Sequence, residues 1–208
     1  MSRYFTKTLA SLEPYTPGEQ LKIADIVKLN ANENPYPPAP GVAAAVAAAV
    51  PGLRLYSDLT NSDLNAAIAR HWGVRPENIL CGNGSDENLL LALRAFCDEN
   101  TPLAFADVTY SFYTVLCDLL HIPQHVIPLE SDLTIDLKTY CGLHETIVIA
   151  NPNAPTSLLA PVDAIEEVLK TNPDNIVIVD ETYVEFAPAG ASCLPPVSYT
   201  HLRAHETC

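Results

Sequence analysis

The pattern of apolar and polar positions predicts strands and helices in alternation from about residue 60 onward. Short apolar runs without a polar face are typical of strands that are covered on both sides. The stretches between these runs have the composition and spacing of helices. The predicted strands are 79–81, 103–106, 126–127, 146–150 and 176–179, and the predicted helices are 62–72, 85–96, 111–120 and 161–170. This order predicts an α/β fold, a mostly parallel sheet flanked by helices.

Both ends of the chain depart from this alternation. Residues 1–40 are rich in proline and asparagine and have little periodicity, so we expect an extended N-terminal arm there, because proline blocks helix formation. A helix-favouring segment at 43–50 then opens a domain that we expect to span 41–194. Residues 195–208 are polar and continue no strand–helix unit, and we expect them to form a tail outside the fold.

Composition narrows the class of protein further. The chain has 208 residues, 48% of them hydrophobic and 17% charged, which is typical of a globular protein with a buried core. Its net charge of −14 would repel nucleic acid and anionic membranes, so neither is expected as a partner. The six cysteines lack metal-ligand spacing, and neither a membrane span nor the apolar core of a signal peptide is visible. We therefore expect free thiols, no metal site and a cytoplasmic location.

The segment Gly82-Asn83-Gly84-Ser85 lies between a predicted strand and a predicted helix. Glycine permits a tight turn there, and the free N–H groups at the start of the helix suit a phosphate. Taken alone, the segment is better interpreted as an ordinary strand-to-helix turn with Ser85 as the helix cap.

Three other features fall at the ends of predicted strands. Asp180 lies at the carboxyl end of the strand predicted at 176–179, where open α/β sheets bind ligands, and an acid there can keep a pyridinium nitrogen protonated. A capping or metal-adjacent acid is an equal alternative for this position. Residues 151–157 predict a rigid turn, and Tyr110 is suited to stack on a flat ring or to lie at the edge of the core. The ordered series of these features favours a ligand site.

This series resembles the N-terminal half of fold-type I pyridoxal-phosphate aminotransferases, most closely the histidinol-phosphate aminotransferases. The matching segments are 14–15, 29–35, 54–56, 82–87, 109–111, 151–156 and 180–183. The resemblance implies pyridoxal 5'-phosphate as cofactor and, in histidine biosynthesis, amino transfer between glutamate/2-oxoglutarate and histidinol phosphate/imidazole-acetol phosphate. A threonine-phosphate decarboxylase-like enzyme and a non-catalytic binder of cofactor or phosphate are the alternatives.

The resemblance also implies roles for individual residues. The backbone amides of Ser85 and Asp86 would hold the cofactor phosphate, and Tyr110 would stack on the pyridine ring. Asp180 would pair with the ring nitrogen, and Tyr183 would hydrogen-bond the ring hydroxyl.

Where the family usually has an asparagine before Pro-Thr-Gly, this chain has Ala154, and Asn153 is the nearest substitute as a cofactor contact. Tyr56 would reach the cofactor of the partner subunit in a homodimer. Tyr15 would contact the substrate phosphate, and Asn32 would border the substrate.

The catalytic residue of this family is a lysine that forms a Schiff base with the cofactor, and the resemblance places it after Asp180. The chain has five lysines, and the last of them is Lys170. We therefore expect no catalytic residue within this chain, and we interpret the chain as a truncated, inactive fragment.

Overall fold

The computed structural model describes residues 4–12, 23, 26–28, 30, 32–194 and 203–204. The chain divides into two compact units. Met1–Glu13 and Cys81–Cys208 form the first, which contains the sheet and is called the sheet unit here, and Pro14–Leu80 forms the second, the helical unit. Within the described ranges, no helix has both the length and the apolar character needed to cross a membrane.

A parallel sheet with strand order β2-β1-β3-β4-β5 organises the sheet unit. Its strands are β1 (Leu103–Ala106), β2 (Gln124–Ile127), β3 (Thr146–Ala150), β4 (Val177–Asp180) and β5 (Arg203–Ala204). Ala150 pairs with Asp180 in the register of β3 and β4. The carboxyl ends of these two central strands therefore lie side by side at one edge of the sheet.

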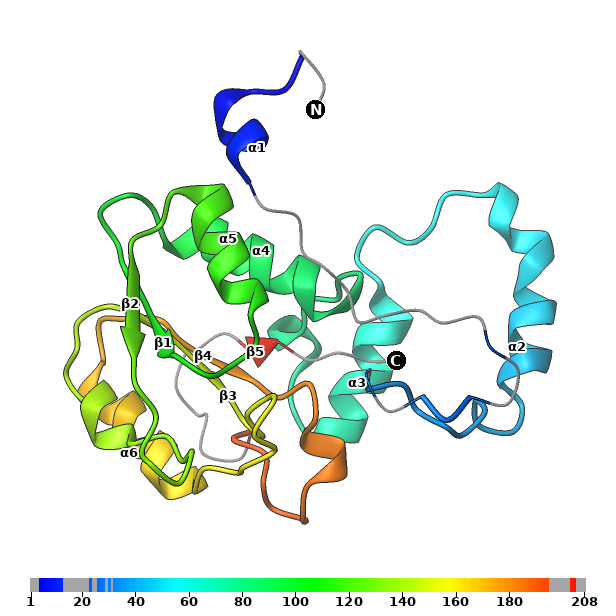
Figure 1. Ribbon diagram of the computed structural model, residues 1–208. Coiled ribbons are helices and arrows are strands. Elements are labelled where there is room, and N and C mark those ends of the chain that lie inside the picture. The colour runs from blue at the N-terminus through cyan, green and yellow to red at the C-terminus, as the bar shows by residue number, and fades with distance from the viewer. Residues whose placement is uncertain are drawn as a thin grey trace. The chain divides into compact units, whose positions relative to one another are not determined.

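Helices cover both faces of this sheet, as Figure 1 shows for α4 and α5 on one side and α6 on the other. The helices are α4 (Gly84–Phe96), α5 (Phe112–Leu120) and α6 (Val162–Thr171), and a short 3-10 turn, η3 (Leu137–Tyr140), accompanies α6. Phe105 of β1 packs toward α4 and α5, whereas its neighbour Ala104 packs toward α6. Burial of both faces explains why these strands are continuously apolar, and the predicted α/β fold with a parallel sheet is confirmed.

The strands predicted at 103–106 and 146–150 match β1 and β3 residue for residue, and the helix predicted at 62–72 also matches at both ends. The other confirmed elements differ by one or two residues at their ends. The strand predicted at 79–81 is wrong, because these residues adopt no regular structure. A strand requires a neighbouring strand for its backbone hydrogen bonds, and the described sheet includes no partner for this segment. Leu80 is accordingly 70% exposed.

The helical unit contains α2 (Val42–Ala49), η1 (Val50–Arg54), α3 (Ser62–Trp72) and η2 (Pro76–Asn78). The helix predicted at 62–72 is confirmed. The carboxylate of Asp58 accepts hydrogen bonds from the backbone N–H and the hydroxyl of Ser62, which satisfies a donor of the first helical turn. Gly73 ends the helix with a positive φ of 68°.

Two segments near the ends of the chain have structure where the sequence predicted none. The helix α1 (Lys7–Ser11) lies within the expected extended arm, and the Thr6 hydroxyl caps it by accepting a hydrogen bond from Leu9 N. At the other end, β5 pairs in parallel with β4, so that two residues of the expected tail extend the sheet. After β4, the 3-10 turn η4 (Val184–Phe186) leads into residues 187–194.

Candidate functional site

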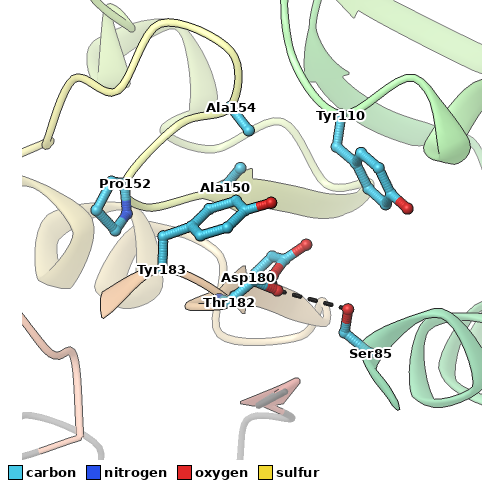
Figure 2. Close-up of a pocket in the computed structure, with 8 residues that line it drawn as sticks. All are labelled: Ser85, Tyr110, Ala150, Pro152, Ala154, Asp180, Thr182 and Tyr183. Carbon is cyan, nitrogen blue, oxygen red and sulfur yellow. Dashed lines mark hydrogen bonds between the residues drawn. The ribbon is translucent and has the colours of Figure 1, made fainter. Parts of the chain in front are cut away.

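A pocket that is partly open to solvent lies at the carboxyl ends of β3 and β4. Its walls come from the start of α4, the loop after β1, the end of β3 with its following loop, and the end of β4. The lining residues are Ser85, Tyr110, Ala150, Pro152, Ala154, Asp180, Thr182 and Tyr183. The structure thus brings segments from four parts of the sheet unit together at the edge where parallel sheets commonly bind ligands (Figure 2).

Among these lining residues, only Asp180 has a carboxylate side chain. Asp180 is buried, with 5% of its surface exposed. Its Oδ1 accepts hydrogen bonds from Thr182 N at 3.2 Å and from Thr182 Oγ1 at 2.7 Å. Its Oδ2 accepts a hydrogen bond of 2.7 Å from the phenol of Tyr113. Within the described part of the chain, no lysine or arginine lines the pocket. A buried carboxylate held in this way is complementary to a ligand that carries a protonated nitrogen.

Tyr113 lies in the first turn of α5 and is completely buried. Burial, followed by the nearby charge of Asp180, raises the pKa of the Tyr113 phenol well above its usual value of 10.0. The phenol therefore stays protonated over the physiological range and remains a hydrogen-bond donor to Asp180.

Two tyrosines stand on opposite sides of the pocket, and Figure 2 shows the ring of Tyr183 pointing across it toward Tyr110. Both the hydroxyl and the ring of Tyr110 are held by neighbouring side chains. Its hydroxyl donates to Asp86 Oδ1 at 3.0 Å, and its ring packs edge-on against Tyr113 with centroids 5.7 Å apart. The two phenols form a polar and aromatic frame that suits a flat ligand.

The start of α4 is built by the predicted glycine turn. Gly84 has a φ of 83°, which residues with a side chain rarely adopt. A side chain on Gly82 would collide with Asn88. Ser85 follows, nearly fully buried, and its Oγ lies 3.4 Å from the hydroxyl oxygen of Thr182 (Figure 2). The first turn of a helix has N–H groups without partners inside the helix, so this wall of the pocket is suited to an anion.

Asn153 is buried but does not line the pocket. Its amide nitrogen donates to Val108 O at 2.9 Å and to Thr156 Oγ1 at 3.1 Å, and its Oδ1 accepts from Thr109 Oγ1 at 2.8 Å. These bonds tie the loop after β3 to the loop that carries Tyr110. Asn153 thus stabilises the loops around the pocket without lining it, whereas its neighbour Ala154 is one of the lining residues.

The other candidate residues lie outside the pocket of the sheet unit. Tyr56 and Asn32 belong to the helical unit, where both are exposed, and Tyr15 lies outside the described residues. Sequence reasoning missed Thr182 and Tyr113. Thr182 follows Asp180 by two residues, a spacing at which a hydroxyl bonds a carboxylate, so it could have been found. Tyr113 is 67 residues from Asp180, and nothing in the sequence links the two.

The family model described as aminotransferase class I and II matches residues 24–203. The chain belongs to this family. It is 46% identical over 191 residues to histidinol-phosphate aminotransferase 2 of Dechloromonas aromatica, covering 89% of this chain and 54% of the relative. It is 42% identical over 208 residues to histidinol-phosphate aminotransferase of Brachyspira hyodysenteriae, covering 100% of this chain and 59% of the relative.

A solved aminotransferase structure is also similar. Histidinol-phosphate aminotransferase from Sinorhizobium meliloti, in complex with pyridoxal-5'-phosphate, has a TM-score of 0.77 and 25% identity, covering 92% of this chain and 54% of that one. The chain therefore spans about half the length of the aminotransferases that it matches. The expected aminotransferase fold and family are confirmed.

Proposed function

We propose that this chain forms the cofactor-binding part of a pyridoxal-phosphate-dependent histidinol-phosphate aminotransferase. The observation that carries the proposal is the buried carboxylate of Asp180, held by fixed donors at the floor of a pocket whose described lining residues include no cationic side chain. The names of the similar proteins support the substrate class.

The chemistry of the pocket fits this cofactor. A carboxylate is suited to a protonated pyridine nitrogen, phenols are suited to a flat ring and its hydroxyl, and a helix start is suited to a phosphate. Asp180, Tyr183 and Tyr110 supply the first two features, and the first turn of α4 supplies the third. When bound, the cofactor supplies an electron-withdrawing ring that stabilises negative charge on the substrate carbon.

Each of these residues has a separate task in the proposal. Asp180 would hold a proton on the ring nitrogen, and Tyr110 would contact the ring. Tyr183 would bond the ring hydroxyl, and the amides of Ser85 and Asp86 would bind the phosphate. Asn153 acts through the loop that it holds, since its amide is engaged with Val108 and with two threonines.

The substrates in this proposal are glutamate/2-oxoglutarate and histidinol phosphate/imidazole-acetol phosphate. Tyr15 and Asn32 keep their proposed roles at the substrate. We also propose a homodimer in which Tyr56 reaches the cofactor of the partner subunit. In support, Tyr56 is fully exposed, and α2 in the same unit buries none of its apolar residues. Sedimentation of the chain, with and without cofactor, measures this association.

No described lysine lines the pocket, and a covalent attachment of the cofactor requires one. Lys170 lies in the last turn of α6 and forms an ion pair of 2.9 Å with Glu166, and Lys138 lies in η3. We therefore propose that the 208-residue chain by itself binds the cofactor weakly and non-covalently and does not transfer amino groups.

Two measurements on the purified chain test these proposals separately. Calorimetric titration with pyridoxamine 5'-phosphate, which lacks the aldehyde needed for covalent attachment, is expected to give weak, saturable binding with one site per chain. Absence of binding would reject the cofactor site.

Incubation with pyridoxal 5'-phosphate, borohydride reduction and peptide mass mapping then test for covalent attachment. We expect no stoichiometric modification of any single lysine, and no amino transfer from glutamate to imidazole-acetol phosphate. One site-specific pyridoxyl-lysine at full stoichiometry would overturn the proposal that the chain alone is inactive.

A further inference from the structure

We propose that Tyr113 is a positioning residue that directs the Asp180 carboxylate and keeps the shared proton on the cofactor nitrogen rather than on Asp180. This role rests on the proposed function, because it requires a pyridine ring in the pocket. Tyr113 does not line the pocket, and its phenol acts through Asp180.

Tyr113 occupies one of the few acceptor sites on the Asp180 carboxylate and so determines which site is left for a ligand. An ionised carboxylate offers about four lone-pair directions. Thr182 N and Oγ1 engage Oδ1, and the Tyr113 phenol engages Oδ2, so three donors of this unit are already in place. The remaining direction on Oδ2 is set by where Tyr113 lies, and a ring N–H in the pocket has to meet it there.

Tyr113 is held rigidly enough to set that direction. Its ring packs edge-on against Phe105 of β1 at 6.0 Å between centroids and against Tyr110 at 5.7 Å. Its side chain is fully buried in the cluster formed by α4, α5 and the sheet. The donor therefore does not have to be ordered when a ligand binds.

The same bond also affects where a shared proton lies. A hydrogen bond to the charged form of a carboxylate favours that form. Asp180, Tyr110 and Asp86 are the charged or titratable groups that act on Tyr113, and together with burial they keep its phenol protonated. The phenol of Tyr113 can only donate to Asp180, and this donation would favour a shared proton on the ring nitrogen of a bound cofactor.

The test uses the full chain with pyridoxamine 5'-phosphate labelled with ¹⁵N at the ring nitrogen. Protonated and neutral ring nitrogens have well-separated ¹⁵N chemical shifts, and a purely structural tyrosine would not change them. In Tyr113→Phe we expect a shift toward the neutral nitrogen and affinity about tenfold weaker. Tyr140→Phe is the matched control, because Tyr140 is equally buried but packs on the α6 side of the sheet. It is expected to leave the shift unchanged.

A second replacement keeps the shape of the side chain if Tyr113→Phe folds poorly. 4-Aminophenylalanine at position 113 is a weaker donor of nearly the same size, and we expect an intermediate ¹⁵N shift. An unchanged shift in the variants that bind would overturn this role and leave the proposed function standing. Failure of the unmodified chain to bind pyridoxamine phosphate would instead reject the proposed function and this role together.

A cofactor-free measurement isolates the bond itself. Tyr113→Phe, Asp180→Asn and the double variant form a cycle in urea unfolding, and we expect the single effects on the folding equilibrium constant to be non-additive by about tenfold. Additive effects would overturn the proposed coupling between the two residues.

Discussion

The phenol of Tyr110 donates a 3.0 Å hydrogen bond to Asp86 Oδ1, which links the loop after β1 to the first turn of α4. This bond therefore fixes the position of the Tyr110 ring relative to the first turn of α4, the wall of the pocket that is suited to an anion. The two residues are 24 positions apart, and each was a candidate cofactor residue from the sequence. Their bond gives the Asp86 side chain a task in addition to the proposed one of its backbone amide.

Replacing Tyr110 separates the contribution of its ring from that of its hydroxyl. Tyr110→Phe keeps the ring but removes the bond to Asp86, and we expect affinity for pyridoxamine phosphate to fall about threefold to fivefold. Tyr110→Ala also removes the stacking surface, and a loss of about tenfold or more is expected. Calorimetric titration measures both. Equal affinity of Tyr110→Ala and the unmodified chain would contradict a stacking role.

Asp180→Asn tests the charge at the floor of the pocket. Asparagine keeps the size of the side chain but cannot pair as an anion with a protonated ring nitrogen, so we expect binding of pyridoxamine phosphate to weaken about tenfold to a hundredfold. Asp174→Asn is the control, because Asp174 is exposed, just before β4, and does not line the pocket. If both variants bind equally well, Asp180 does not hold the cofactor nitrogen.

The buried thiol of Cys117 predicts a loss of stability at alkaline pH. Burial raises the pKa of Cys117 from 9.0 to about 12, with smaller contributions from Cys97 and Asp118. As the pH rises, the thiol ionises in the unfolded chain before it does so in the folded protein. The buried thiol therefore contributes fully to the free energy of unfolding below pH 9, and this contribution is lost between pH 9 and about 12. The slope reaches about 1.4 kcal/mol per pH unit.

Urea unfolding at several pH values measures this contribution. In Cys117→Ala the free energy of unfolding is expected to fall less steeply above pH 9 than in the unmodified chain, although the variant is less stable at neutral pH because it leaves a small cavity. Cys81→Ala serves as a control at a partly exposed position. Parallel curves for Cys117→Ala and the unmodified chain would refute the assignment.

Glu181 anchors the segment that follows η4 next to the site. It is 2% exposed, and its carboxylate accepts hydrogen bonds from Cys193 N and the Ser192 hydroxyl. Glu181→Ala leaves these donors unsatisfied, and we expect a loss of about 2–3 kcal/mol in the free energy of unfolding. Hydrogen exchange at 191–194 should become faster. Glu185→Ala, at an exposed position of η4, is expected to change neither quantity.

The sequence alone was sufficient for the features that depend on neighbouring residues. Continuous apolar runs identified β1 and β3. Both faces of these strands are buried, so apolar residues are favoured along the whole run. Asp180 was identified as a candidate because a carboxylate directly after such a run has to lie at the ligand-binding edge of a parallel sheet. The glycines before Ser85 identified the turn into α4, because glycine adopts the backbone angles that such a tight turn requires.

The tertiary structure decided what depends on residues far apart in the chain. Residues 79–81 have the composition of a strand but no partner in the described sheet, and strand formation depends on a partner. Asn153 resembles a ligand contact in the sequence, yet its amide is bonded to Val108, Thr109 and Thr156 behind the pocket. Tyr113 reaches Asp180 only because α5 packs against the sheet, since hydrogen bonds depend on distance in space and not on separation in sequence.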